Sequence, residues 1–235
     1  MISLRNVTKS YYHGFHSAHV LRRVSFEIEK GEFVTIMGPS GSGKSTLLHI
    51  MGLLDEASEG EYYFDGRPTH EMNERQRTAL HRENIGFVFQ AYHLIDDLTV
   101  YENLETPLLY RKVSGSDRKS MVAEMLDRFN MVAKKDLFPS QLSGGQQQLV
   151  GVARALIIQP RVIFADEPTG NLHSSQGDEI MDRLRRLNRE DGVTIVQVTH
   201  NAGYAGYGHR IIDLLDGRIK DDRPVRDHEL SNAPD

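Results

Sequence analysis

A glycine-rich segment that contains one lysine and several hydroxyl residues could hold phosphate. Its residues are Gly38, Pro39, Ser40, Gly41, Ser42, Gly43, Lys44, Ser45 and Thr46. The spacing Gly-x-x-x-x-Gly-Lys-Ser lets successive backbone N–H groups point at phosphate oxygens, and the positive end of a following helix favours the same anion. We expect Lys44 to reach the β and γ phosphates of a nucleotide and the hydroxyl of Ser45 to ligate Mg²⁺. We call residues 38–46 the phosphate loop.

Two other interpretations of this segment are weaker. A Gly/Ser-rich turn with an accidental lysine would not need the apolar run 33–37 before it, nor the helically spaced apolar residues after it. A dinucleotide-binding loop would need a third glycine where Thr46 stands. The order of strand, loop and helix therefore favours phosphate binding.

Two adjacent carboxylates follow an apolar run in the second half of the chain. Residues 162–165 are typical of a buried strand, and Asp166 and Glu167 come directly after them. Ligands bind at the carboxyl ends of parallel strands. Asp166 suits Mg²⁺ held through water, and Glu167 is the candidate that orients and activates an attacking water. Alone, such a pair is as often a solvated turn, but the phosphate loop favours the functional interpretation.

A second glycine loop stands about a hundred residues after the first. Its members are Ser143, Gly144, Gly145 and Gln146, and helically spaced apolar residues follow them. A glycine loop at a helix N-terminus, with a serine hydroxyl as a further donor, also suits an anion. One nucleotide does not need two such loops. We therefore expect the two loops to contact a nucleotide from different sides, with the second loop supplied by another subunit. We call residues 143–146 the signature loop.

The elements that must position these residues can be predicted from hydrophobic spacing. Apolar or alternating runs predict strands over 2–7, 24–28, 33–37, 62–64, 85–89, 162–165 and 194–199. Helical spacing covers 99–139, about 145–158 and 176–187. Strands that alternate with helices imply an α/β protein with a mostly parallel core sheet covered on both faces. We interpret the middle helical stretch as an inserted lobe.

The composition excludes several other kinds of protein. The chain has 235 residues, 28 Lys and Arg against 33 Asp and Glu, and a formal net charge of −5, which argues against nucleic-acid binding. It has no cysteine, so disulfide frameworks, thiol nucleophiles and cysteine-ligated metal sites are excluded. No segment approaches roughly 18 uncharged apolar residues, and the start lacks a signal-peptide pattern, so we expect neither a membrane span nor secretion.

The ordered set of motifs resembles the ATP-binding subunit of an ATP-binding-cassette (ABC) transporter, from residue 2 to about residue 220. The resemblance implies a P-loop NTPase fold with an N-terminal antiparallel β subdomain and an inserted α-helical subdomain. It implies a single domain over 1–235: a RecA-like core in 1–90 and 160–220, a helical subdomain in about 91–159, and a polar tail in 221–235. ATP and Mg²⁺ are the implied substrate and metal.

The same resemblance implies roles for single residues. The signature loop would complete the ATP site of the opposite subunit in a head-to-tail dimer. Gln90 would join Mg²⁺ and sense the transmembrane partner, and His200 would contact the γ phosphate. Tyr11 resembles the aromatic that stacks on adenine, although Tyr12 stands beside it. The implied catalytic set is therefore Lys44, Gln90, Glu167 and His200, and the implied metal set is Ser45, Gln90 and Asp166.

Two positions depart from the family pattern. His173 stands where the family usually has aspartate in a loop at the dimer interface, and Leu149 stands where an arginine commonly follows the signature glutamines. These departures put coupling and hydrolysis rate in question, while the residues implied in catalysis are intact. We therefore expect a working but slow ATPase.

Further stretches are similar to the branch that contains the lipoprotein-release, macrolide-export, antimicrobial-peptide-resistance and cell-division ATPases. They are 52–55, 89–94, 142–148 and 165–172. The resemblance implies a FtsX- or MacB-like permease partner, a second copy of the chain, no nucleic acid, and a cytoplasmic, peripheral place on the inner or plasma membrane. The alternatives are an ATP-binding regulatory scaffold of a membrane complex with little hydrolysis, and a non-transport ABC ATPase.

Overall fold

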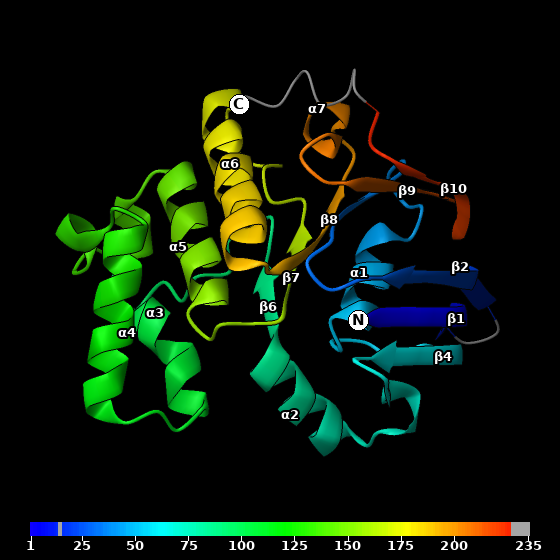
Figure 1. The fold of residues 1–235 in the computed structure, drawn as a ribbon, viewed down its shortest axis with the longest axis horizontal. Coiled ribbons are helices and arrows are strands. Elements are labelled where there is room, and N and C mark those ends of the chain that lie inside the picture. Colours follow the sequence, from blue (N-terminus) through cyan, green and yellow to red (C-terminus); the bar gives the residue numbers. More distant parts are fainter. Residues whose placement is uncertain (14–15, 227–235) are drawn as a thin grey trace.

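The computed structural model describes residues 1–13 and 16–226, which form two sheets and a set of helices (Figure 1). The larger sheet has six strands in the order β10-β9-β3-β8-β7-β6. In chain order these are β3 (Phe33–Met37), β6 (Ile85–Val88), β7 (Val162–Asp166), β8 (Thr194–Thr199), β9 (Arg210–Leu215) and β10 (Arg218–Pro224). All neighbours pair in parallel except β10, which pairs antiparallel with β9.

The alternation of side chains along the core strands buries both faces of this sheet. On β7, Ile163 and Ala165 pack into an apolar cluster that includes residues of α3 (Val100–Tyr110), α5 (Gly144–Leu156) and α6 (Ser174–Asp191). Val162 and Phe164 of the same strand pack on the other face, against α1 (Lys44–Met51) and the smaller sheet. Because successive residues of a strand point to opposite faces, one apolar run fills two cores.

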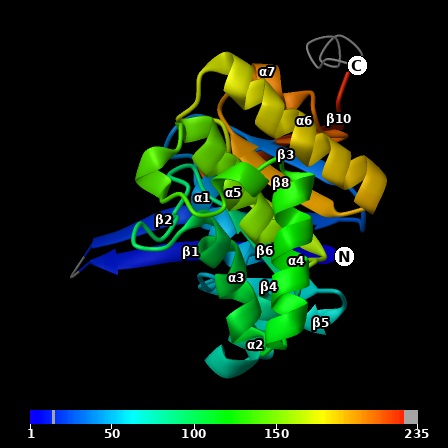
Figure 2. The same cartoon turned by 90° about the vertical axis from the view of Figure 1, so that its left-hand side faces the viewer.

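The smaller sheet is antiparallel and has the order β2-β1-β4-β5. Its strands are β1 (Ile2–His13), β2 (His16–Ile28), β4 (Glu59–Phe64) and β5 (Arg67–Pro68). The hairpin of β1 and β2 projects from the body of the molecule (Figure 2). Asp65 and Gly66 connect β4 to β5 with φ angles of 52° and 77°, and two successive positive φ angles are what a tight hairpin turn requires.

The helical lobe lies beside the six-stranded sheet, on the side away from the antiparallel sheet (Figure 1). It contains α3, α4 (Gly115–Arg128) and the start of α5. Each helix begins at a hydroxyl residue that accepts a bond from the first turn: Thr99, Ser114 and Ser143, because the first N–H groups of a helix have no partner within it. The sequence pattern predicts one helical stretch over 99–139, which the structure divides into α3 and α4, and a separate helix at about 145–158, which corresponds to α5.

The structure also contains elements that hydrophobic spacing did not predict. These are α2 (Glu74–Asn84), α7 (Ala202–Ala205), β5, β9 and β10. Helix α2 has few apolar residues, but Asn73 and Gln76 form a capping box at its start, a signal readable in the sequence. The antiparallel strands also extend well beyond the expected 2–7 and 24–28.

The expected polar tail was partly wrong. Strand β10 continues to Pro224 and pairs with β9, so residues 221–224 belong to the sheet. Arg210 of β9 forms a bidentate pair with Asp222 of β10, with both N–O distances at 2.6 Å, and this pair holds the polar strand in place. Residues 227–235 of the expected tail lie outside the described part of the chain.

Candidate active site

The phosphate loop joins β3 to α1 and owes its shape to its glycines. Gly38, Gly41 and Gly43 have φ angles of 153°, 78° and 102°, which L-residues with a side chain rarely adopt. A Cβ at Gly38 would lie 2.1 Å from the carbonyl oxygen of Leu214. The loop can therefore approach β9 this closely only with glycine at that position.

Lys44 places its charge at the centre of the loop. Its ammonium donates hydrogen bonds to the carbonyl oxygens of Gly38 and Pro39, at 2.9 and 3.0 Å, and the residue is 8% exposed. A cation held among backbone groups that curl around it is suited to bind phosphate oxygens.

A cavity of about 780 Å³ opens over the loop. Most of the phosphate loop lines it, and Gln90, Glu167 and His200 from three other parts of the chain line it too. These residues follow the carboxyl ends of β3, β6, β7 and β8, which meet at one edge of a parallel sheet. Four segments far apart in the sequence therefore converge on one cavity.

Ser45 and Asp166 form a hydroxyl–carboxylate pair beside the cavity. The Ser45 hydroxyl donates to Asp166 Oδ1 at 3.0 Å, across 121 residues of chain. Burial raises the pKa of Asp166 above its ordinary value, against the opposing effect of this hydrogen bond. No three His, Cys, Asp or Glu side chains gather as a metal site among the described residues. Mg²⁺ needs only one or two protein carboxylates beside nucleotide phosphates, and this oxygen pair fits that need.

Glu167 and His200 are in direct contact. His200 Nδ1 lies 2.8 Å from Glu167 Oε1, and the hydroxyl of Thr199 donates to the other carboxylate oxygen at 3.2 Å. Glu167 has a φ of 46°, an uncommon conformation for a residue with a side chain. Its backbone N–H donates to the carbonyl of Val198 at 3.0 Å, which helps to hold it there.

Gln90 is joined to Asn171, a residue that the sequence patterns did not single out for a role. The Gln90 amide donates to Asn171 Oδ1 at 3.3 Å, and the Asn171 amide donates to the Gln90 carbonyl at 3.0 Å. A Cβ at Gly170 would lie 2.7 Å from the Gln90 amide nitrogen. The segment after Glu167 therefore packs directly on Gln90.

Residues 89–99, the Gln90 loop, are also tied to α5. Tyr92 and His93 both have positive φ, at 60° and 48°. Arg154 of α5 donates to their carbonyl oxygens at 3.0 and 2.6 Å, and burial lowers the pKa of its guanidinium. Arg154 is a further residue that hydrophobic spacing alone could not identify, because only the tertiary contact reveals its partners.

The signature loop does not join the cavity. Ser143 caps α5: its hydroxyl accepts from the Gln146 N–H at 3.3 Å, and its own N–H donates to the Gln146 side chain at 3.1 Å. Neither residue, nor Gly144 or Gly145, is among the described residues that line the cavity over the phosphate loop. Leu149 is buried in the apolar cluster of the helical lobe.

Two other expected site residues lie at the margin. Tyr11 on β1 does not line the cavity, but its hydroxyl donates to Asp55 at 2.7 Å and interacts with the side chain of Thr46, which does line it. The side chain of Tyr12 is outside the described part of the structure. His173 stands at the N-cap of α6 without a side-chain cap bond, a bond that aspartate is well suited to make.

Comparison with known proteins gives the family. Residues 21–170 match the model of a family described as ABC transporter. The chain is 47% identical over 233 residues to MJ0796 of Methanocaldococcus jannaschii, an uncharacterized ABC transporter ATP-binding protein, covering 96% of this chain and 98% of that one. It is also 45% identical over 223 residues to a macrolide export ATP-binding/permease protein, MacB 1/2, of Paracoccus denitrificans. The aligned region covers 95% of this chain but only 33% of MacB 1/2.

The fold agrees with these matches. A solved structure described as the dimeric post-hydrolysis state of the MJ0796 ATP-binding cassette, bound to ADP and Pi, superposes with a TM-score of 0.89 at 45% identity, covering 96% of this chain and 99% of that one. The expected α/β fold is thereby confirmed. The family match and these relatives show that the chain belongs to the ABC transporter family, as an ATP-binding cassette ATPase.

Proposed function

We propose that this chain binds ATP with Mg²⁺ in the cavity over the phosphate loop and hydrolyses it to drive a membrane permease. The observation that carries the proposal is the convergence of the loop, Gln90, Glu167 and His200 on one cavity. In this proposal Lys44 binds the β and γ phosphates, Glu167 activates the attacking water, and His200 stabilises charge that develops on the γ phosphate.

The metal would be held by Ser45, Asp166 and Gln90. The first two already share a hydrogen bond, and Gln90 lines the same cavity. When bound, Mg²⁺ neutralises charge on the phosphate oxygens. Ser45 and Asp166 supply the oxygen ligands that such a hard cation prefers.

We further propose that two copies of the chain close head to tail around two nucleotides. The signature loop carries a capped helix N-terminus, which favours an anion, yet it lies apart from the cavity of its own chain. A solved structure of MJ0796 is described as dimeric. On this proposal, Ser143, Gly144, Gly145 and Gln146 reach the nucleotide of the partner copy.

The permease would be of the MacB or FtsX type and would dock on the side of the Gln90 loop. Ile95 in that loop is 45% exposed. Leu109 and Tyr110, which are 50% and 69% exposed, lie at the other end of α3, the helix that begins where the loop ends. Tyr110 also borders a cavity of about 780 Å³ between α2 and α3. No helix of the described residues has the length and apolarity to cross a bilayer, so this proposal places the chain at the cytoplasmic face through its partner.

The cargo in this proposal is a lipoprotein, peptide or drug that is exported or extracted. The relative from Paracoccus denitrificans is described as a macrolide export protein and carries its permease in the same chain. Capture of a tagged chain from detergent-solubilised membranes tests the partner: recovery of one permease supports it, and recovery of ribosomes or DNA contradicts it.

We also propose that the chain divides into a core subdomain, residues 1–90 and 160–220, and a helical subdomain, residues about 91–159.

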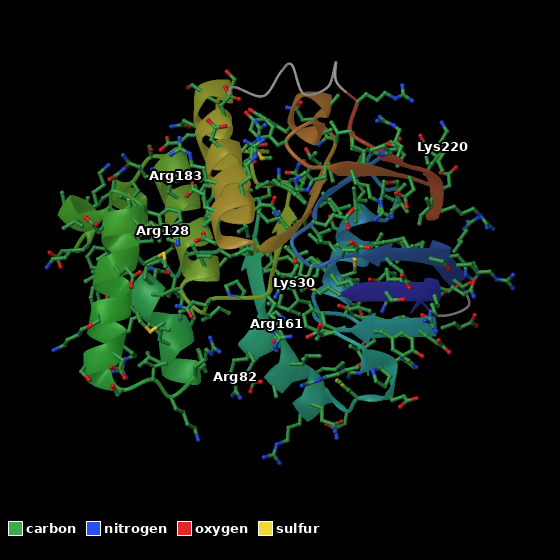
Figure 3. All side chains as sticks on the ribbon, in the orientation of Figure 1. Lys30, Arg82, Arg128, Arg161, Arg183 and Lys220 are labelled. Carbon is green, nitrogen blue, oxygen red and sulfur yellow. The ribbon has the colours of Figure 1, made fainter. Side chains whose placement is uncertain are left out.

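Two alternatives are less well supported. A non-transport ABC ATPase that acts on nucleic acid would favour a net positive charge, but the formal net charge of this chain is −5. In Figure 3 the labelled Lys220 lies on the opposite side of the view from Arg128 and Arg183. Arg128 is also paired with Asp191. A regulatory scaffold with little hydrolysis would fit the uncapped His173, whereas the Glu167–His200 contact favours hydrolysis.

The substitution Glu167→Gln tests hydrolysis and dimerisation together. The amide can keep the position of the side chain but cannot activate water, so we expect turnover to fall by at least about 100-fold. We expect the variant with MgATP to elute as a dimer, measured by size-exclusion chromatography with light scattering. Glu124→Gln, an exposed residue of α4, is the matched control and should behave as the wild type. A variant that stays monomeric with MgATP, or retains turnover, would contradict the proposal.

A further inference from the structure

Tyr11 is held by two charged side chains that the mechanism above does not use. Its hydroxyl donates to Asp55 Oδ2 at 2.7 Å. Lys9 donates to the other oxygen of the same carboxylate at 2.6 Å and to the carbonyl oxygen of Glu56 at 2.7 Å. The Lys9 ammonium also lies over the Tyr11 ring, 4.8 Å from its centre. The carboxylate therefore joins the tyrosine and the lysine that covers it.

This group is anchored to the helix that begins in the phosphate loop. Asp55 follows the end of α1, and its backbone N–H donates to the carbonyl of His49 in that helix at 3.2 Å. The other end of α1 begins at Lys44. Asp55 thus links the position of the Tyr11 ring on β1 to the position of the phosphate-binding residues.

The charges of the group suit this linkage at neutral pH. Burial alone would raise the pKa of Asp55, but the hydrogen bonds from Lys9 and Tyr11 outweigh it and hold the pKa below its ordinary value. Burial and the carboxylate raise the pKa of Tyr11, so its hydroxyl remains a donor. The ionised Asp55 can accept both bonds at once.

We propose that Asp55 and Lys9 are positioning residues for the nucleotide base: they fix the Tyr11 ring beside the phosphate loop, with Lys9 over one face and the other face left for adenine. This inference rests on the proposed nucleotide site. Tyr11 is 46% exposed, and an exposed ring that is free to rotate loses conformational entropy when a ligand stacks on it. Fixing the ring beforehand removes that loss and improves base binding without touching the phosphates.

The chain contains a matched arrangement that serves as a control. On the same sheet, the Tyr63 hydroxyl donates to Glu61 at 3.0 Å, and the Arg5 guanidinium lies 4.9 Å from the centre of the Tyr63 ring. The Arg5 and Glu61 side chains are 60% and 48% exposed, against 10% and 29% for Lys9 and Asp55. Tyr11 interacts with the side chain of Thr46 in the phosphate loop, whereas the Tyr63 ring packs edge-on against His70. Glu61→Ala therefore removes the same kind of hydrogen bond from a tyrosine that is not joined to the phosphate loop.

The test compares ligands with and without a base by calorimetry on the full chain with Mg²⁺. ADP carries adenine and is not hydrolysed, whereas pyrophosphate carries only the phosphates. We expect Asp55→Ala to weaken ADP binding about fivefold to tenfold, part of the effect of losing a stacked base, and to leave pyrophosphate binding within about twofold. Lys9→Met should weaken ADP in the same direction, and Asp55→Asn by only about twofold to threefold, because its amide oxygen still accepts from Tyr11. Glu61→Ala should change neither affinity.

Steady-state kinetics add a second readout. The KM for ATP should rise in Asp55→Ala by a similar factor while kcat stays within about twofold, since an interaction with the base is the same in the ground and transition states. Equal weakening of ADP and pyrophosphate, or unchanged ADP binding in Asp55→Ala and Asp55→Asn, would overturn the inference alone. A wild type that binds neither ligand would overturn the nucleotide site and the inference with it. If the alanine variant does not fold, Asp55→Asn and Lys9→Met decide.

Discussion

At the scale of single residues, the carboxylate that we propose to activate water lies in a conformation that costs free energy. Glu167 has a φ of 46°, and a left-handed residue with a side chain costs on the order of 1–3 kcal/mol. Contacts with His200, Thr199 and the carbonyl of Val198 hold it there. Glu167 comes directly after the end of β7 and lines the cavity over the phosphate loop.

Asp166 carries a second cost, which leads to a prediction about stability. Its folded pKa is raised by burial, so the folded state binds more protons than the unfolded state between the two pKa values, and stability falls as pH rises through this window. At neutral pH the buried charge therefore destabilises the free chain. We expect Asp166→Asn to raise the melting temperature, by roughly 2–4 °C per kcal/mol recovered, while turnover is lost.

Scanning calorimetry at two pH values measures this effect. The advantage of Asp166→Asn should be present at pH 7 and should shrink as pH falls below the folded pKa, where the wild-type carboxyl is also neutral. Asp96→Asn, on the surface of the Gln90 loop, is the control. A lower melting temperature for Asp166→Asn at pH 7 would show that the carboxylate stabilises the free chain.

At the scale of elements, α5 connects the parts of the site. It begins at the signature loop, and Arg154 near its end binds the carbonyls of Tyr92 and His93. Between them, Gln148 is fully buried and its amide donates to the carbonyls of Pro168 and Phe89, at 2.6 and 3.3 Å. Because these contacts all belong to one helix, a displacement of the Gln90 loop would move α5, and with it the signature loop and the segment after Glu167.

Gln148→Leu tests how much this connection stabilises the chain. Leucine fills similar space but removes the donor of the buried Pro168 carbonyl oxygen, which costs about 1–3 kcal/mol, whereas the Phe89 carbonyl still accepts from the N–H of Tyr92. We expect the free energy of unfolding in urea to fall by that amount. Gln147→Leu is the matched control, since Gln147 is partly exposed and donates one bond, to Leu142. An equal decrease in the free energy of unfolding in the two variants would mean that the buried contacts of Gln148 stabilise the chain no more than the single bond of Gln147.

At the scale of the whole molecule, the two glycine loops are placed apart. The phosphate loop opens into the cavity with Glu167 and His200, whereas the signature loop caps a helix that begins outside that lining. If two copies close head to tail, each complete site takes one loop from each copy. In such a symmetric dimer, the phosphate loop and the signature loop of one chain therefore belong to two different ATP sites.

Mixing two inactive variants tests this arrangement. Lys44→Ala removes the phosphate-loop charge, and Ser143→Arg blocks the signature loop. Each variant alone should be inactive. In a mixed dimer one site carries both defects and the other carries neither. Random pairing in an equimolar mixture makes about half of the dimers mixed, and each of these has one working site of two. The mixture should therefore regain about a quarter of wild-type ATPase activity. Phosphate release against time measures it. No recovery on mixing would place both loops in the same site of one chain.

Much of the site could be predicted from the sequence because its parts are local. The phosphate loop needs glycines at fixed spacing between a strand and a helix, and Gly38 and Gly43 do adopt the left-handed backbone that spacing implies. Asp166 and Glu167 follow a run of apolar residues that had to be a buried strand. Each of these features is fixed by neighbours within a few residues, so residue types and period are sufficient to predict them.

What the sequence determined by itself was therefore the kind of backbone at each motif and the family that the order of motifs indicates. Only the tertiary structure decided which motifs touch: Ser45 with Asp166 across 121 residues, Glu167 with His200, Arg154 with the Gln90 loop, and Tyr11 with Asp55. These contacts join segments that are far apart in the chain, and the strands beside them stand in a different order in the sheets than in the chain. Spacing along a chain determines local conformation, whereas hydrogen-bond partners from distant segments are set by how the sheets and helices pack.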